Sequence, residues 1–191
     1  MKPDVGTDWS SFAQVAPDLA RRARAAAERH GFVLVGTIRQ DGTPRISPVE
    51  IHFVRQQLML VMIAGSHKAR DLDRDPRLVL QTPVSNPASP EAEAKLRGQV
   101  VDVDAAQREA TAASVESASG WRPRDTWRFF AVTLHAASYI EWHQDKMTLS
   151  RWDRVNGLWP TERRRLDMEA SRYVPVGGDT ADGLGYAPPA H

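Results

Sequence analysis

The first half of the chain carries apolar, β-branched stretches that predict short antiparallel strands. These stretches cover residues 32–39, 44–54 and 58–64, and the third is apolar on both faces, so we expect it to be buried on both. Asp41-Gly42 predicts a two-residue hairpin, because a type I′ turn needs positive φ at both central positions. Residues 55–57 are expected to form the next turn. Three consecutive strands joined by hairpins are therefore predicted.

Helix signals separate these strands from further apolar runs. An alanine-rich helix is expected over residues 17–30, because proline opens it and glycine follows its end. Ser66 is a candidate N-cap for a helix over 67–75, and Asp104 with Gln107 resembles a capping box that opens a third helix. Further strands are predicted over residues 77–82, 96–103, 128–142 and 146–155. About seven strands that must bury both faces favour a mainly β protein, an antiparallel β-barrel with flanking helices.

Length and the distribution of these elements indicate one domain. The 191 residues suffice for one sizeable core. The barrel domain is expected over residues 16–158, after a loosely ordered N-terminus at 1–15. Residues 159–191 are rich in Arg, Gly and Pro without periodicity, which indicates an irregular tail, partly disordered or wrapped over a neighbour.

Composition excludes several classes of function. A net charge of +1 does not predict a nucleic-acid partner, which requires a strongly basic face. The absence of cysteine excludes disulfides, thiolate zinc sites and cysteine nucleophiles. No His/Asp/Glu cluster has metal-ligand spacing, so no metal site is expected. No apolar run approaches a membrane span and the first residues do not resemble a secretory signal, so we expect a cytoplasmic protein without a membrane partner.

A phosphate site is predicted where the second strand meets the helix that Ser66 caps. If residues 55–57 form the turn, Arg45 faces position 67 and Ser47 faces Gly65. A helix N-terminus offers free N–H groups and a favourable dipole, to which Arg45 and Lys68 would add positive charge. The alternative is that both cations are solvated surface residues and that Ser66 is only a cap.

The segments DGTPRISPV and GSHKARDLDRDPRLVLQ, separated by an apolar strand, resemble the pyridoxamine 5′-phosphate oxidase-like family of FMN-binding split barrels. The resemblance is strongest over residues 20–103 and continues as strand order to about residue 155. It implies an antiparallel barrel of six or seven strands. It also implies a homodimer with FMN sites at the subunit interface.

The resemblance assigns eight positions to cofactor binding: Arg45, Ile46, Ser47, Met62, Ile63, Ser66, His67 and Lys68. His67 stands where the vitamin-forming oxidases carry an arginine, and it can still donate to a phosphate. Glu50 stands where those oxidases carry a lysine, so that contact is not carried over. The segment that grips pyridoxal phosphate in those oxidases has no match after Trp142, so pyridoxamine phosphate is not the expected substrate.

The function implied by the resemblance is an FMN-dependent oxidoreductase that acts on a small molecule. A bound flavin performs hydride and electron transfer itself, so no acid–base dyad is required and no catalytic side chain is assigned. The alternatives are a deazaflavin-dependent reductase and a non-catalytic flavin- or haem-binding protein. Six tryptophans could each stack on a cofactor ring or pack in a core or interface, and His52, His135 and His143 are expected to be structural.

Overall fold

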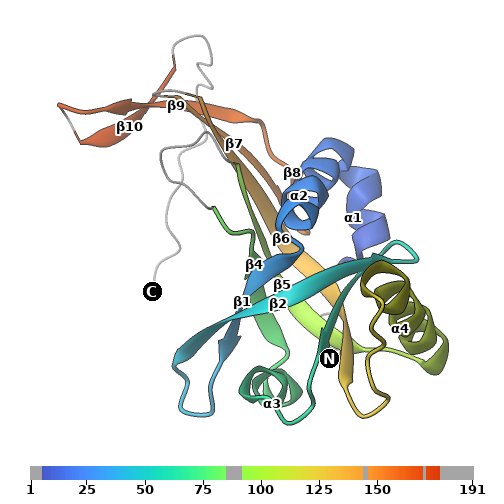
Figure 1. The fold of residues 1–191 in the computed structure, drawn as a ribbon. Coiled ribbons are helices and arrows are strands. Elements are labelled where there is room, and N and C mark those ends of the chain that lie inside the picture. The colour runs from blue at the N-terminus through green and yellow to red at the C-terminus, as the bar shows by residue number, and fades with distance from the viewer. Residues whose placement is uncertain (1–5, 85–91, 144–145, 170, 177–191) are drawn as a thin grey trace.

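Six antiparallel strands close into a barrel in the computed structural model of the protein, which describes residues 6–84, 92–143, 146–169 and 171–176 (Figure 1). Around the barrel the strands follow the order β6-β3-β2-β1-β4-β5, and β5 pairs with β6 to close it. Their bounds are Phe32–Ile38 (β1), Pro44–Val54 (β2), Gln57–Met62 (β3), Arg77–Gln81 (β4), Glu93–Asp102 (β5) and Arg128–His143 (β6). The predicted mainly β barrel is confirmed.

Two N-terminal helices pack against the barrel core. α2 (Pro17–His30) has the predicted bounds and buries an alanine-rich face against the core. The preceding segment, expected to be loosely ordered, instead forms α1 (Trp9–Val15), whose N-cap Asp8 accepts a hydrogen bond from the Ser11 N–H. Trp9 and Phe12 of α1 are buried in the same core. The burial of these two aromatic side chains stabilises a helix that is too short to be stable alone.

The loops of the first two hairpins differ in length from those expected. β1 and β2 are joined by a three-residue loop, Gln40–Gly42, in which the Gly42 N–H bonds the Arg39 carbonyl and Gly42 alone has positive φ, +83°. The two-residue type I′ turn lies instead between β2 and β3, where Arg55 and Gln56 have φ of 48° and 60°. The β2–β3 register therefore differs by one residue from the prediction, and Ile51 pairs with Leu60.

β2 and β3 separate after only four residue pairs. Their pairing ends at Ile51–Leu60, beyond which β2 continues along β1 while β3 continues along β6. The two strands thus form a fork in the barrel wall. Arg45 and Ser47 pair with Thr37 and Val35 of β1, so the predicted pairing with residues after β3 does not occur.

The outer face of β3 is covered by α4 (Ala105–Ser119). Met59 packs with Ala110 and Val61 with Ala112, so this strand is buried on both faces, as predicted. Asp104 caps the helix through the Gln107 N–H, and Gly120 ends it with φ of +73°. The Gln107 side chain does not complete a capping box but donates to the Val54 carbonyl at the end of β2. α4 is thereby fixed against the β2–β3 hairpin.

The C-terminal strands extend the sheet beyond the barrel (Figure 1). β7 (Lys146–Asp153) pairs with β6 as the predicted final hairpin, and the two-residue β8 (Gly157–Leu158) pairs with β7. β9 (Glu162–Asp167) also pairs with β7, and β10 (Arg172–Pro175) pairs with β9, where an irregular tail was expected. The rest of that tail, 177–191, and most of the proline-rich loop, 85–91, lie outside the described residues.

Gly98 provides a test of the barrel closure. The β5–β6 register shifts between Arg97 and Gly98, and a Cβ at Gly98 would lie 1.9 Å from the Thr133 carbonyl oxygen. Gly98→Ala should therefore lower the free energy of unfolding by about 3 kcal/mol in urea denaturation, because the obstructing atom is backbone. Gly65→Ala is the control, since no atom lies within 4 Å of its Cβ position. Equal stability of the two variants would contradict this packing.

Candidate ligand cavity

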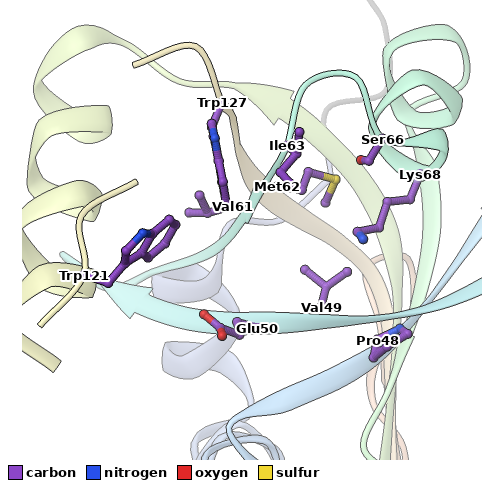
Figure 2. Close-up of a pocket in the computed structure, with 10 residues that line it drawn as sticks. All are labelled: Pro48, Val49, Glu50, Val61, Met62, Ile63, Ser66, Lys68, Trp121 and Trp127. Carbon is purple, nitrogen blue, oxygen red and sulfur yellow. The ribbon is translucent and has the colours of Figure 1, made fainter. Parts of the chain in front are cut away.

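A cavity of about 380 Å³, open to solvent, lies in the fork between β2 and β3. Figure 2 shows Glu50 and Trp121 toward one side of the cavity and Ser66 and Lys68 toward the other. The lining residues come from β2, the end of β3, the start of α3 (His67–Arg74) and the α4–β6 loop: Pro48, Val49, Glu50, Val61, Met62, Ile63, Ser66, Lys68, Trp121 and Trp127. Its size falls within the ordinary range for small-molecule sites, roughly 300–1,000 Å³.

The buried Asp71 fixes α3 (His67–Arg74) to the barrel. Its Oδ2 accepts hydrogen bonds from Thr37 Oγ1 of β1 at 2.9 Å and from Arg45 Nε of β2 at 2.6 Å. Arg74 lies 3.5 Å from the other carboxylate oxygen. Burial acts to raise the pKa of Asp71, but the hydrogen bonds from Arg45 and Thr37 outweigh it, so the pKa lies below the ordinary 3.8. The carboxylate is therefore ionised at neutral pH and ties the helix to two strands.

The amino end of α3 reaches the cavity because of this attachment. Ser66 is the N-cap, as predicted, and its hydroxyl accepts a hydrogen bond from the Ala69 N–H at 3.3 Å. Ser66 and Lys68 both line the cavity, and Figure 2 shows the Lys68 side chain directed toward Val49 across it. Unpaired N–H groups, a hydroxyl and an ammonium group thus meet at one end of the cavity, a combination that suits an anion.

Half of the eight predicted site residues line the cavity, namely Met62, Ile63, Ser66 and Lys68. The other four lie beside it. Arg45 is held by Asp71, Ser47 lies on the same face of β2 as Arg45, and Ile46 is on the opposite face with 72% of its surface exposed. The exposed His67 ring has its Nδ1 3.1 Å from the Arg70 guanidinium, away from the cavity lining. Their part in cofactor binding stays a prediction.

Two tryptophans complete the cavity at the end away from Lys68. The Trp121 and Trp127 rings lie 4.9 Å apart at 53°. Their loop is held on α4, because Arg108 donates to the carbonyls of Asp125 and Trp127. The sequence distinguished them only as two of six tryptophans, since Trp121 stands 55 positions after Ser66 in the chain.

Trp142, Trp152 and His52 are not among the residues that line the cavity. Trp152 packs on Phe12 in the core, and Trp142 contacts Tyr173 between β6 and β10. His52 is half-buried with its Nε2 3.9 Å from Glu50, and burial lowers its pKa more than that carboxylate raises it. Among the described residues no group of three His, Asp or Glu side chains could hold a metal ion. No described helix is both long and apolar enough to cross a bilayer.

The barrel is split where β2 and β3 diverge, and the cavity lies in this split. This arrangement is a split-barrel fold. The sequence model of the pyridoxamine 5′-phosphate oxidase family matches residues 19–141. The chain belongs to this family, which confirms the resemblance seen in its motifs. No curated protein matches the sequence.

Several solved structures share the fold at low sequence identity. The haem-binding protein from Mycobacterium smegmatis superposes with a TM-score of 0.58 at 18% identity, over 73% of this chain and 59% of that one. PhzG from Burkholderia lata 383, in complex with tetrahydrophenazine-1-carboxylic acid, superposes with a TM-score of 0.58 at 12% identity, over 78% of this chain and 91% of that one. A Clostridium acetobutylicum protein of the pyridoxinephosphate oxidase family superposes with a TM-score of 0.54 at 16% identity, over 72% of this chain and 95% of that one. The chain thus spans only about three fifths of the haem-binding protein.

Asp71→Asn tests the attachment of α3. The folded pKa is depressed, so the stabilisation by the ionised carboxylate is complete above pH 3.8 and is lost as the pH falls through the lower, folded pKa. At pH 7 the variant should lose about 3 kcal/mol of stability, because Arg45 loses its charge partner.

Urea denaturation at pH 7 and pH 3 measures both effects, and the difference between wild type and variant should shrink at pH 3. Asp18→Asn, which removes an exposed carboxylate on α2, is the control and should change little. A stability difference of the same size at both pH values would show that the charge of Asp71 does not stabilise the fold.

Proposed function

We propose that the protein is an FMN-dependent oxidoreductase that acts on a small molecule. The observation that carries the proposal is the polarity of the cavity in the fork. Ser66 and Lys68 at the amino end of α3 suit a phosphate, while Val49, Val61 and Met62 provide the apolar surface that a flat ring system requires. The donor set and the lining therefore fit FMN.

The phosphate end depends on α3 in two ways. Lys68 supplies a mobile positive charge, and the first turn of the helix supplies backbone N–H groups that no carbonyl within the helix accepts. Arg45 contributes by holding Asp71, and this contact uses only Nε of a guanidinium that has five N–H donors. Its remaining donors can serve a phosphate while Nε keeps the helix in place.

The ring end orients and shields the cofactor. Met62 ends β3, Ile63 follows it, and Val49 of β2 lines the same cavity, so a planar group between the strands would contact apolar side chains from both. A flavin bound here supplies hydride or electron transfer to the substrate, while the protein supplies orientation and electrostatics.

Replacing Lys68 tests the phosphate contact. Lys68→Ala should weaken FMN binding about 10- to 100-fold, since a charge-assisted hydrogen bond contributes roughly 1.5–3 kcal/mol. Riboflavin, which lacks the phosphate, should be affected much less. Quenching of flavin fluorescence on titration with protein measures both affinities.

Lys146→Ala, on the exposed start of β7, is the matched control and should bind FMN as the wild type does. Equal losses for FMN and riboflavin would show that Lys68 acts on the fold. Failure of the wild type to bind FMN would refute the proposal, and a Soret band on titration with haem would replace it with haem binding.

The proposed enzyme is a homodimer in which a second copy covers the open side of the cavity. Ile63 at the mouth is 56% exposed, and Ile46 lies on the same face of β2 as Pro48, which lines the cavity. Large exposed apolar side chains beside a binding site are typical of an interface.

Ile46→Glu should therefore convert the dimer to a monomer in sedimentation equilibrium, because a charge would be buried in the contact. Val155→Glu is the control: this side chain is 85% exposed in the turn after β7, so its replacement should leave the dimer intact. A wild type that sediments as a monomer would contradict the proposed assembly.

A further inference from the structure

Glu50, Trp121 and Trp127 form an end of the cavity that the phosphate and the flavin ring do not explain. We name these three residues the acid–aromatic end. Figure 2 shows the Glu50 carboxylate directed toward the Trp121 side of the cavity, away from Ser66. An anion-binding helix terminus and a carboxylate therefore face the same cavity from different ends.

The charge of Glu50 is not neutralised by the described residues. Its side chain is 69% exposed, and the basic group within ion-pair distance is His52, whose Nε2 lies 3.9 Å away. Burial lowers the pKa of His52, so at neutral pH this imidazole is uncharged. Arg122, which directly follows Trp121, is already bound by Glu109 and Glu116. Glu50 therefore presents a full negative charge beside the indoles.

The two indoles are held in place although they are not needed for the barrel core. Trp121 is 43% exposed, and neither indole belongs to the main core cluster. Arg122 anchors the start of their loop to α4 through Glu109 and Glu116, and Arg108 anchors its end through the Asp125 and Trp127 carbonyls. A fixed pair of partly exposed rings beside a carboxylate is a preorganised binding surface.

We propose that the acid–aromatic end binds the positively charged head group of the substrate, a planar or quaternary nitrogen cation. Tryptophan is the side chain that attracts cations most strongly through its ring face, and Glu50 adds a full charge next to it. The same carboxylate disfavours an anionic substrate at this end. The inference deepens the proposed function and rests on it for the placement of FMN at the Lys68 end.

A pair of probes of nearly equal shape separates charge from shape. The cation 1-methylnicotinamide and neutral nicotinamide are titrated calorimetrically into the FMN-loaded protein and into the protein without FMN. The cation should bind about 10-fold more tightly than the neutral probe, as cation–π attraction with a carboxylate allows. Glu50→Gln should reduce this preference to about twofold or less, and Trp121→Leu should weaken the cation more than the neutral probe.

Glu28→Gln removes one exposed negative charge from α2 and is the matched control, which should keep the wild-type preference. FMN affinity is measured for each variant, and Glu50→Gln should bind FMN as the wild type does. Equal binding of the two probes to the wild type, or an unchanged preference in Glu50→Gln, would overturn the inference even if FMN binds. A protein that shows the Glu50-dependent preference but binds no FMN would refute the proposed function and retain the cation site.

Discussion

A single buried carboxylate determines where the cavity has its anion-binding end. Asp71 would be costly to bury alone, but Thr37 and Arg45, from two neighbouring strands, satisfy it. Because a helix is rigid over this distance, fixing Asp71 also fixes Ser66 and Lys68 about one turn earlier. The position of α3, and hence the charge distribution around the cavity, follows from this one group.

The second constraint is the divergence of β2 and β3. After the pair Ile51–Leu60 the two strands no longer bond to each other. Each stays in the barrel because its other edge remains paired, β2 with β1 and β3 with β6. α4 then packs on β3 and brings the Trp121–Trp127 loop to the fork. The cavity is thus assembled from segments that are distant in sequence.

The elements with strong local signals were predictable from sequence. Pro17, Ser66, Asp104 and Gly120 mark helix ends that the structure confirms. The turn at residues 55–57 was predicted in place but not in its two-residue form at Arg55-Gln56, because neither residue favours positive φ. The extra turn residue shifted the predicted register by one residue. Arg45 contacts α3 through Asp71 rather than at the helix N-terminus that the sequence predicted, because that contact depends on the packing of α3 on β1. The two tryptophans belong to the cavity only through α4, a long-range contact that no local pattern encodes.

The fork has a consequence for how such a cavity persists in evolution. Beyond the last β2–β3 pair, the two strands face each other with peptide N–H and C=O groups along both edges. Among the described residues, no other strand bonds to these groups. Peptide groups are identical whatever the side chains are. A ligand bound there keeps its hydrogen bonds to the main chain even when nearly every side chain around it is replaced, and the solved structures that share this fold do so at only 12–18% identity to this chain.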